Sequence, residues 1–252
     1  MNDGSRPALH VVAGPNGSGK SMLTAGGALG TGRIIDPDAI ARTINPERPE
    51  AAAVAAGREA IRQQSAAIAA RESFTVETTL SGARTMKLMD QAREAGFRVE
   101  LHYVSPGDPR VNVIRIADRV RQGGHHVPTE DVLRRFARST ENLPRAIAKA
   151  DPATLYDSSG RAYTRAVAEL DREGFAIKEE APTWAKEAAG DEARIWKAEA
   201  ATVQDERIAM MREAEADRAQ GMISADELAQ LRAFHATRDG QAERDGPGGI
   251  RE

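Results

Sequence analysis

The sequence predicts an α/β protein, a parallel β-sheet flanked by helices, followed by an α-helical C-terminal extension. Short apolar runs alternate with Ala-rich, charge-laced stretches over the first 180 residues, and a glycine-rich turn directly follows the first apolar run. After Pro182 almost every stretch is helix-forming. Strands that alternate with helices of this length are typical of βαβ units. We therefore expect a domain at 1–180 and a helical extension at 181–252 with a frayed tail.

Five apolar runs are the expected strands of the parallel sheet, at 9–14, 33–36, 73–77, 97–104 and 154–159. The stretches 50–71 and 84–95 between them have the composition of helices. The fourth run places Arg98, Glu100 and His102 on one face of its strand, because side chains alternate along a strand. A hairpin with a tight turn at DREG is expected to end the domain.

Composition limits the possible classes of protein. The chain has 252 residues, 40% apolar and only 4% aromatic, with no Cys and a net charge of −3. The absence of Cys excludes a disulfide framework and thiolate metal sites and fits a reducing compartment. No apolar run approaches the roughly 20 residues that cross a bilayer, and the charge gives no general attraction to nucleic acid. We expect a cytoplasmic protein that contacts neither membranes nor nucleic acid.

The strongest motif is AGPNGSGKS, which contains the spacing G-x-x-x-x-G-K-[ST] of a P-loop. Its glycines let backbone N–H groups point at phosphate oxygens, and the following helix directs its positive end at the same anion. Lys20 is expected to neutralise the β- and γ-phosphates and Ser21 to ligate Mg²⁺. We expect ATP (or GTP) with Mg²⁺ to bind the residues of this turn: Gly14, Pro15, Asn16, Gly17, Ser18, Gly19, Lys20, Ser21 and Met22.

The stretch VETTLSG, residues 76–82, permits two interpretations. Its LSG begins like the signature of transporter-type ATPases, but those proteins carry an Asp-Glu pair after the next strand. Here that strand ends in Ser105-Pro106, which argues against a transporter. The alternative is that Glu77 and Thr79, at the end of the third strand, bind the acceptor of a phosphoryl group.

Two carboxylates in IIDPDAIAR follow the second strand. Ligands bind beyond the carboxyl ends of strands in open parallel sheets. A kinase needs a carboxylate there to orient or deprotonate a hydroxyl, and Asp38 is the candidate base. Asp36 is a candidate substrate-binding residue, with capping of the following helix as an equally good alternative.

A mobile lid is the expected role of residues 115–139. A Gly-Gly-His-His-Val-Pro loop separates two groups of arginines: Arg115, Arg119 and Arg121 before it, and Arg134, Arg135 and Arg138 after it. Most of the six are expected to lie on a solvated helix face. Guanidinium groups from such a lid would stabilise charge on the transferred phosphoryl group. His125, in the loop, is a candidate hinge residue or substrate contact, with a plain exposed loop as an equally good alternative.

Seven blocks in order resemble the zeta-toxin family of P-loop kinases, in particular its branch with ETTLSG and GGH-VP motifs. The blocks are GPNGSGKS, DPDAIAR, FTVETTLSG, GFRVELHYV, RVRQGGHHVP, RRFARSTENL and LYDSSG, and they cover about residues 8–180. The resemblance implies phosphorylation of a hydroxyl with ATP and Mg²⁺. The acceptor in the best-known members is a UDP-activated amino sugar (UDP-N-acetylglucosamine), while related members use others, including a dinucleotide.

The resemblance also implies roles for matching residues. Lys20 and Ser21 would take nucleotide and Mg²⁺, Asp38 would be the base, and Glu77 and Thr79 would bind the acceptor. The lid arginines would clamp phosphates, with Arg119 and Arg135 as catalytic and Arg121 and Arg138 as nucleotide-binding candidates. Sugar-phosphorylating members carry an arginine shortly after Glu-x-Thr, whereas this chain has Leu80 and Ser81 there. That departure leaves the acceptor open.

The extension at 181–252 lies outside the resemblance. It carries a narrow apolar stripe, Trp196, Val203 and Met210, at intervals of seven residues. Toxins of this family are commonly held inactive by a small helical antitoxin. The extension is therefore a candidate built-in restraint or partner-binding arm, with a plain sheet-covering helix as the alternative.

The sequence leaves three alternatives to a small-molecule kinase. They are an ATPase without an acceptor, a silent ATP-binding module and a polynucleotide 5′-hydroxyl kinase.

Overall fold

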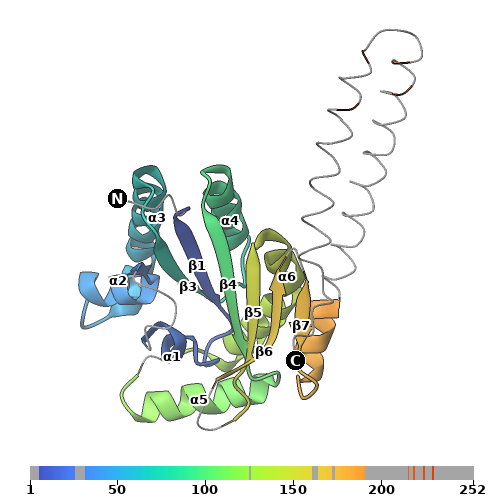
Figure 1. Ribbon diagram of the computed structural model, residues 1–252. Coiled ribbons are helices and arrows are strands. Elements are labelled where there is room, and N and C mark those ends of the chain that lie inside the picture. Colours follow the sequence, from blue (N-terminus) through green and yellow to red (C-terminus); the bar gives the residue numbers. More distant parts are fainter. Residues whose placement is uncertain are drawn as a thin grey trace.

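The computed structural model describes residues 6–25, 32–124, 126–160, 164–171 and 174–190, together with four isolated positions further on. Its sheet has seven strands in the order β2-β3-β1-β4-β5-β6-β7 (Figure 1). The strands are β1 (Ala8–Ala13), β2 (Arg33–Ile35), β3 (Phe74–Thr78), β4 (Arg98–Ser105), β5 (Pro152–Asp157), β6 (Arg165–Asp171) and β7 (Phe175–Ile177). Every expected strand is present.

The first five strands pair in parallel, and β6 and β7 add an antiparallel hairpin at one edge. The predicted α/β architecture is therefore confirmed, with a mixed rather than purely parallel sheet. Asp171 closes the hairpin turn by accepting a hydrogen bond from Gly174 N at 2.8 Å and donating its own N–H to Gly174 O.

Helices connect the parallel strands. They are α1 (Lys20–Ala25), α2 (Pro37–Ile44), η1 (Pro49–Ala52), α3 (Ala53–Ala70), α4 (Arg84–Glu94), α5 (Pro109–Arg121) and α6 (Thr129–Lys149). The connections β2→β3, β3→β4 and β4→β5 all step the same way across the sheet, so right-handed crossovers place α3, α4 and α6 on one face. The step from β1 to β2 runs in the opposite direction, which places α1 on the other face.

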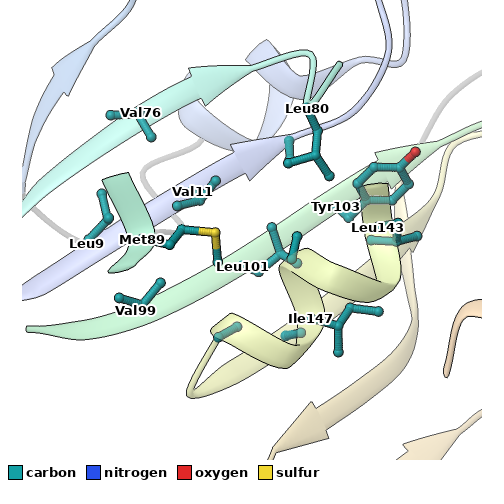
Figure 2. Close-up of a cluster of buried hydrophobic side chains, with 14 of the residues drawn as sticks. Leu9, Val11, Val76, Leu80, Met89, Val99, Leu101, Tyr103, Leu143 and Ile147 are labelled. Atoms are coloured by element: carbon teal, nitrogen blue, oxygen red, sulfur yellow. The ribbon is translucent and has the colours of Figure 1, made fainter. Parts of the chain in front are cut away.

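The main core lies between the sheet and the helices α3, α4 and α6. Leu9 and Val11 of β1 and Leu101 of β4 point toward Met89 of α4 and Ile147 of α6 (Figure 2). These side chains are inaccessible to solvent, and burying one apolar side chain of this size contributes roughly 1.5–3 kcal/mol. The alternation of strand side chains places His10, Glu100 and His102 on the opposite face, together with the buried valines Val12 and Val104.

Residues 181–190 continue the same packing. Positions 183–190 are helical, and Ala181, Ala185 and Ala189 join the main core. The Trp184 ring lies 5.9 Å from that of Tyr103, and a Cβ on Gly107 would come within 2.6 Å of it. The Trp196, Val203 and Met210 stripe lies outside the described residues. No helix in the described part of the chain is long and apolar enough to cross a membrane.

Candidate functional site

The P-loop between β1 and α1 is held by close backbone packing. Gly14 has φ +145°, and a Cβ there would lie 2.1 Å from the carbonyl oxygen of Val104. Gly17 has φ +77°, and its Cβ would lie 2.9 Å from the carbonyl oxygen of Asn112. Side chains cannot occupy either position, so these two glycines set the path of the loop.

Two helices of the expected lid also fix this loop. Asn112 of α5, which is fully buried, donates from Nδ2 to the Asn16 carbonyl at 2.6 Å. Arg135 of α6 donates from Nη1 to Asn16 Oδ1 at 3.2 Å. Asn112 is a positioning residue that no sequence motif indicated, because its spacing from the loop in sequence carries no signal.

Lys20 lies at the centre of the charged groups. Its Nζ donates to the carbonyl oxygens of Gly14 at 2.7 Å and Pro15 at 3.1 Å. Burial lowers the pKa of the Lys20 amino group from 10.5 to about 8. The negative charges of Glu77, Asp38 and Asp36 raise this pKa and so offset part of the shift. Arg119 lowers this pKa further. The structure therefore brings four of the predicted residues within electrostatic range of Lys20.

Glu77 is bound to α1. Its carboxylate accepts from Thr24 Oγ1 at 2.6 Å and from Ser21 Oγ at 3.5 Å. The alternation along β3 explains this contact, since Val76 points into the core and Glu77 points to the face that α1 occupies. Thr24 was not among the predicted residues, although its position one helical turn after Ser21 was a usable signal.

Asp36 and Asp38 occupy the start of α2. Asp36 is the N-cap, and its two oxygens accept from Asp38 N at 2.9 Å and Ala39 N at 3.1 Å. The capping alternative thus describes what Asp36 does in the structure. Asp38 lies in the first helical turn with an exposed side chain, which leaves its carboxylate accessible to a ligand.

The ETTLSG segment forms a turn between β3 and α4. Leu80 has φ +55°, a conformation that costs a residue with a side chain roughly 1–2 kcal/mol. Its buried side chain lies near Tyr103 and Leu143 (Figure 2), and Asn142 Nδ2 donates to its carbonyl at 2.9 Å. The Thr79 hydroxyl lies 2.8 Å from Ser81 Oγ. Thr79 and Glu77 therefore have different partners.

The lid arginines separate into groups. Arg135 contacts the P-loop and Arg119 acts on Lys20, as described above. Arg121 pairs with Asp118, and Arg138 is exposed on α6. Arg115 holds the loop after β5 by donating to the carbonyls of Ser158 at 2.6 Å and Gly160 at 3.0 Å.

An apolar pocket lies between the two lid helices. It is lined by Ile116 of α5 and by Val127 and Val132 near the start of α6. Ile116 also approaches the P-loop, since a Cβ on Gly17 would lie 3.2 Å from Ile116 Cγ1. His125 lies outside the described residues.

Parts of this chain are similar to known proteins. An uncharacterized protein of Haemophilus influenzae is 40% identical over 121 residues, which are 48% of this chain and 86% of that protein. A chain of the AvrRxo1-ORF1:AvrRxo1-ORF2 complex crystallised with sulphate ions gives a TM-score of 0.57 at 17% identity. The alignment covers 71% of this chain and 62% of that one, so this chain spans less than two thirds of its structural relative.

The same complex with ATP gives a TM-score of 0.57 at 16% identity, over 75% of this chain and 64% of that one. A chain of the PezAT chromosomal toxin-antitoxin system of Streptococcus pneumoniae gives 0.48 at 14% identity, over 65% and 73%. At 16–17% identity the likeness to the AvrRxo1 complex is one of fold. Residues 9–143, which contain the P-loop, Asp38, Glu77 and most of the lid, match the model of the AAA domain family, and the chain belongs to that family.

Proposed function

We propose that this protein is an ATP- and Mg²⁺-dependent kinase that phosphorylates a hydroxyl of a small molecule. The observation that carries the proposal is the cluster at Lys20. One half-buried amino group and the carboxylates of Glu77, Asp38 and Asp36 lie at a P-loop whose neighbouring helix supplies Arg119. This arrangement combines phosphate-binding cations with a carboxylate able to activate a hydroxyl.

Nucleotide binding would use the inward N–H groups of the loop and the charge of Lys20. The amino group must exchange its contacts with the Gly14 and Pro15 carbonyls for contacts with phosphate oxygens. The pocket beside Ile116 offers an apolar surface next to the loop for a nucleobase.

The residues beside the loop fit Mg²⁺, which takes oxygen ligands and retains several waters. Ser21 would hold it, with Glu77 behind Ser21 to orient the hydroxyl and accept hydrogen bonds from bound water. When bound at Ser21, the ion would supply positive charge that neutralises the phosphates. Thr24 would keep the Glu77 carboxylate in place.

The transfer would proceed with Asp38 as general base. The acceptor hydroxyl oxygen forms a bond to the γ-phosphorus while the bond to the β,γ-bridging oxygen breaks, and ADP leaves. The hydroxyl proton passes to Asp38. Arg119 and Arg135 would stabilise charge on the transferred group, with Arg121 and Arg138 contacting phosphates when the lid closes.

The acceptor is proposed to be a UDP-activated amino sugar, on the basis of the zeta-toxin resemblance, with other hydroxyl compounds such as a dinucleotide as alternatives. Thr79, Asp36 and His125 would contact it.

A partner protein that blocks the nucleotide site, or the C-terminal segment acting in its place, would restrain the activity. Because residues 181–189 pack in the core, a test of restraint requires a truncation after Gly190 rather than near 181.

The decisive experiment incubates the protein with ATP, Mg²⁺ and a metabolite extract and follows products by mass spectrometry. We expect a metabolite heavier by one phosphoryl group, formed by the wild type and lost in Asp38→Asn. The matched control is Asp90→Asn, because Asp90 of α4 pairs with Lys149, the last residue of α6, and contacts none of the residues assigned to the reaction. If ATP is consumed equally by Asp38→Asn and no metabolite is phosphorylated, the kinase proposal fails and an acceptor-free ATPase replaces it.

A further inference from the structure

A second cluster of potential ligands lies on the sheet, away from the P-loop. His10 of β1 pairs in register with Glu100 of β4, and His102 follows two residues later on the same face of β4. His10 Nδ1 lies 3.3 Å from Glu100 Oε2, and His102 Nε2 lies 3.8 Å from the same oxygen. One atom from each side chain falls within 4.8 Å of the other two.

The two histidine nitrogens that face Glu100 interact with its carboxylate without a well-aligned hydrogen bond. His10 Nδ1 and His102 Nε2 are both buried and make no hydrogen bond of acceptable geometry, although their closeness to the carboxylate holds the pKa of Glu100 below its usual range. His102 is only 9% exposed. A buried polar atom without a well-aligned partner destabilises the fold, and a cation bound between these nitrogens and the carboxylate would satisfy all three groups at once.

The surrounding groups favour a His102 ring that carries its proton on Nδ1. Tyr156 of β5 places its hydroxyl 3.2 Å from His102 Nδ1. When Nδ1 carries the proton and donates it to Tyr156, the lone pair of Nε2 is directed at the cluster, as in metal-bound histidines generally. Arg98 donates to the other Glu100 oxygen at 2.6 Å, which leaves Oε2 for the histidine side.

Two of the three ligand separations are close to those around a tetrahedral ion with short bonds, and the third is within 4.8 Å. Bonds of about 2.1 Å to nitrogen and oxygen give ligand–ligand separations of about 3.4 Å in a tetrahedron. The 3.3 Å and 3.8 Å separations are near this value. Two imidazoles and one carboxylate with a free fourth position are a ligand set for Zn²⁺, whereas Mg²⁺ and Ca²⁺ prefer oxygen ligands throughout.

We propose that His10, Glu100 and His102 form a binding site for a divalent transition-metal ion of the zinc class, distinct from the Mg²⁺ position at Ser21. His102 on β4 and Glu77 on β3 pair with Val12 of β1 from opposite sides. The strands β3 and β4 are therefore roughly 10 Å apart. The ion would clamp β1, which carries the P-loop, to β4. This site does not depend on the kinase proposal, and it stands or falls separately.

The test uses the full chain, stripped with a chelator and saturated with Mg²⁺ and ADP so that the nucleotide site is occupied. We expect calorimetry with Zn²⁺ to show a single tight site and elemental analysis after desalting to find one zinc per chain. Co²⁺ in place of Zn²⁺ should give the strong visible absorption of tetrahedral coordination. A weak octahedral spectrum, or no retained zinc in the wild type, would overturn the proposal without reference to any variant.

Variants test which residues bind the zinc ion. Glu100→Gln and His102→Phe should each lower zinc affinity by at least about 100-fold, and Tyr156→Phe by about 10- to 100-fold, since loss of an outer-shell partner has that effect. A double variant, His125→Gln with His126→Gln, and the variant Glu77→Gln should retain the site. Undiminished zinc binding by folded Glu100→Gln and His102→Phe, or its loss only in the histidine-loop variant, would refute the assignment.

Discussion

The unusual pKa of Lys20 predicts how ATP binding depends on pH. In the free protein, burial holds the pKa of the amino group at about 8. A bound triphosphate places negative charge beside the group and favours its protonated form. Binding is then linked to proton uptake wherever the free protein has lost the proton, which is above pH 8, so affinity must fall as pH rises through that value.

The size of the effect follows from the fraction of free protein that carries the Lys20 proton. That fraction is about nine-tenths at pH 7 and about one-eleventh at pH 9 for a pKa of about 8. The dissociation constant for ATP should therefore rise about tenfold between pH 7 and pH 9, equivalent to about 1.4 kcal/mol. An amino group with its ordinary pKa near 10.4 would change the affinity by only a few per cent over this range.

Calorimetric titration with ATP at fixed free Mg²⁺, in buffers of different ionisation enthalpy, measures both the affinity and the proton uptake. The ATP phosphates have titrated below pH 7, since a phosphate's second pKa is about 6. Lys20→Met should bind more weakly with no dependence on pH, while Lys149→Met, which alters a distant ion pair, should keep the tenfold change. A flat affinity for the wild type, or an equal slope for Lys20→Met, would show that the pKa argument is wrong.

Two further predictions concern the loop and its neighbours. Gly14→Ala should lower the free energy of unfolding by at least about 3 kcal/mol in urea denaturation, because its Cβ would overlap the Val104 carbonyl. Gly82→Ala, where nothing lies within 4 Å, should change it by less than about 0.5 kcal/mol, and equal effects would contradict the packing argument. Thr24→Val should raise the Mg²⁺ concentration needed for half-maximal turnover about tenfold or more, because it removes a hydrogen bond to the Glu77 carboxylate worth roughly 1.5–3 kcal/mol; an unchanged Mg²⁺ requirement would separate Glu77 from the metal.

Local patterns predicted much of the fold. The five apolar runs, the hairpin and the glycine-rich turn all occur where expected, because strands with one buried face and a P-loop with tight backbone contacts leave strong marks on nearby sequence positions. Alternation also put Glu100 and His102 on one face. The site residues themselves were chosen from motif and resemblance, and their roles remain predictions.

The partners of those residues depended on tertiary contacts. Glu77 reaches Thr24, Asn112 supports Asn16, and His10 meets Glu100 across two strands. Each pair is separated by 53 or more residues in the chain, so no local period relates its members. Sheet order and strand register decide which of them come together.

The sequence by itself determined the α/β class, the strand positions and the nucleotide-binding turn, since these follow from interactions between residues close along the chain. Only the tertiary structure decided that the half-buried Lys20 lies among three carboxylates, that Glu77 faces α1, and that two histidines and a glutamate converge on the sheet. The physical reason is that burial and electrostatic interaction depend on distances in space, which the crossovers between strands establish.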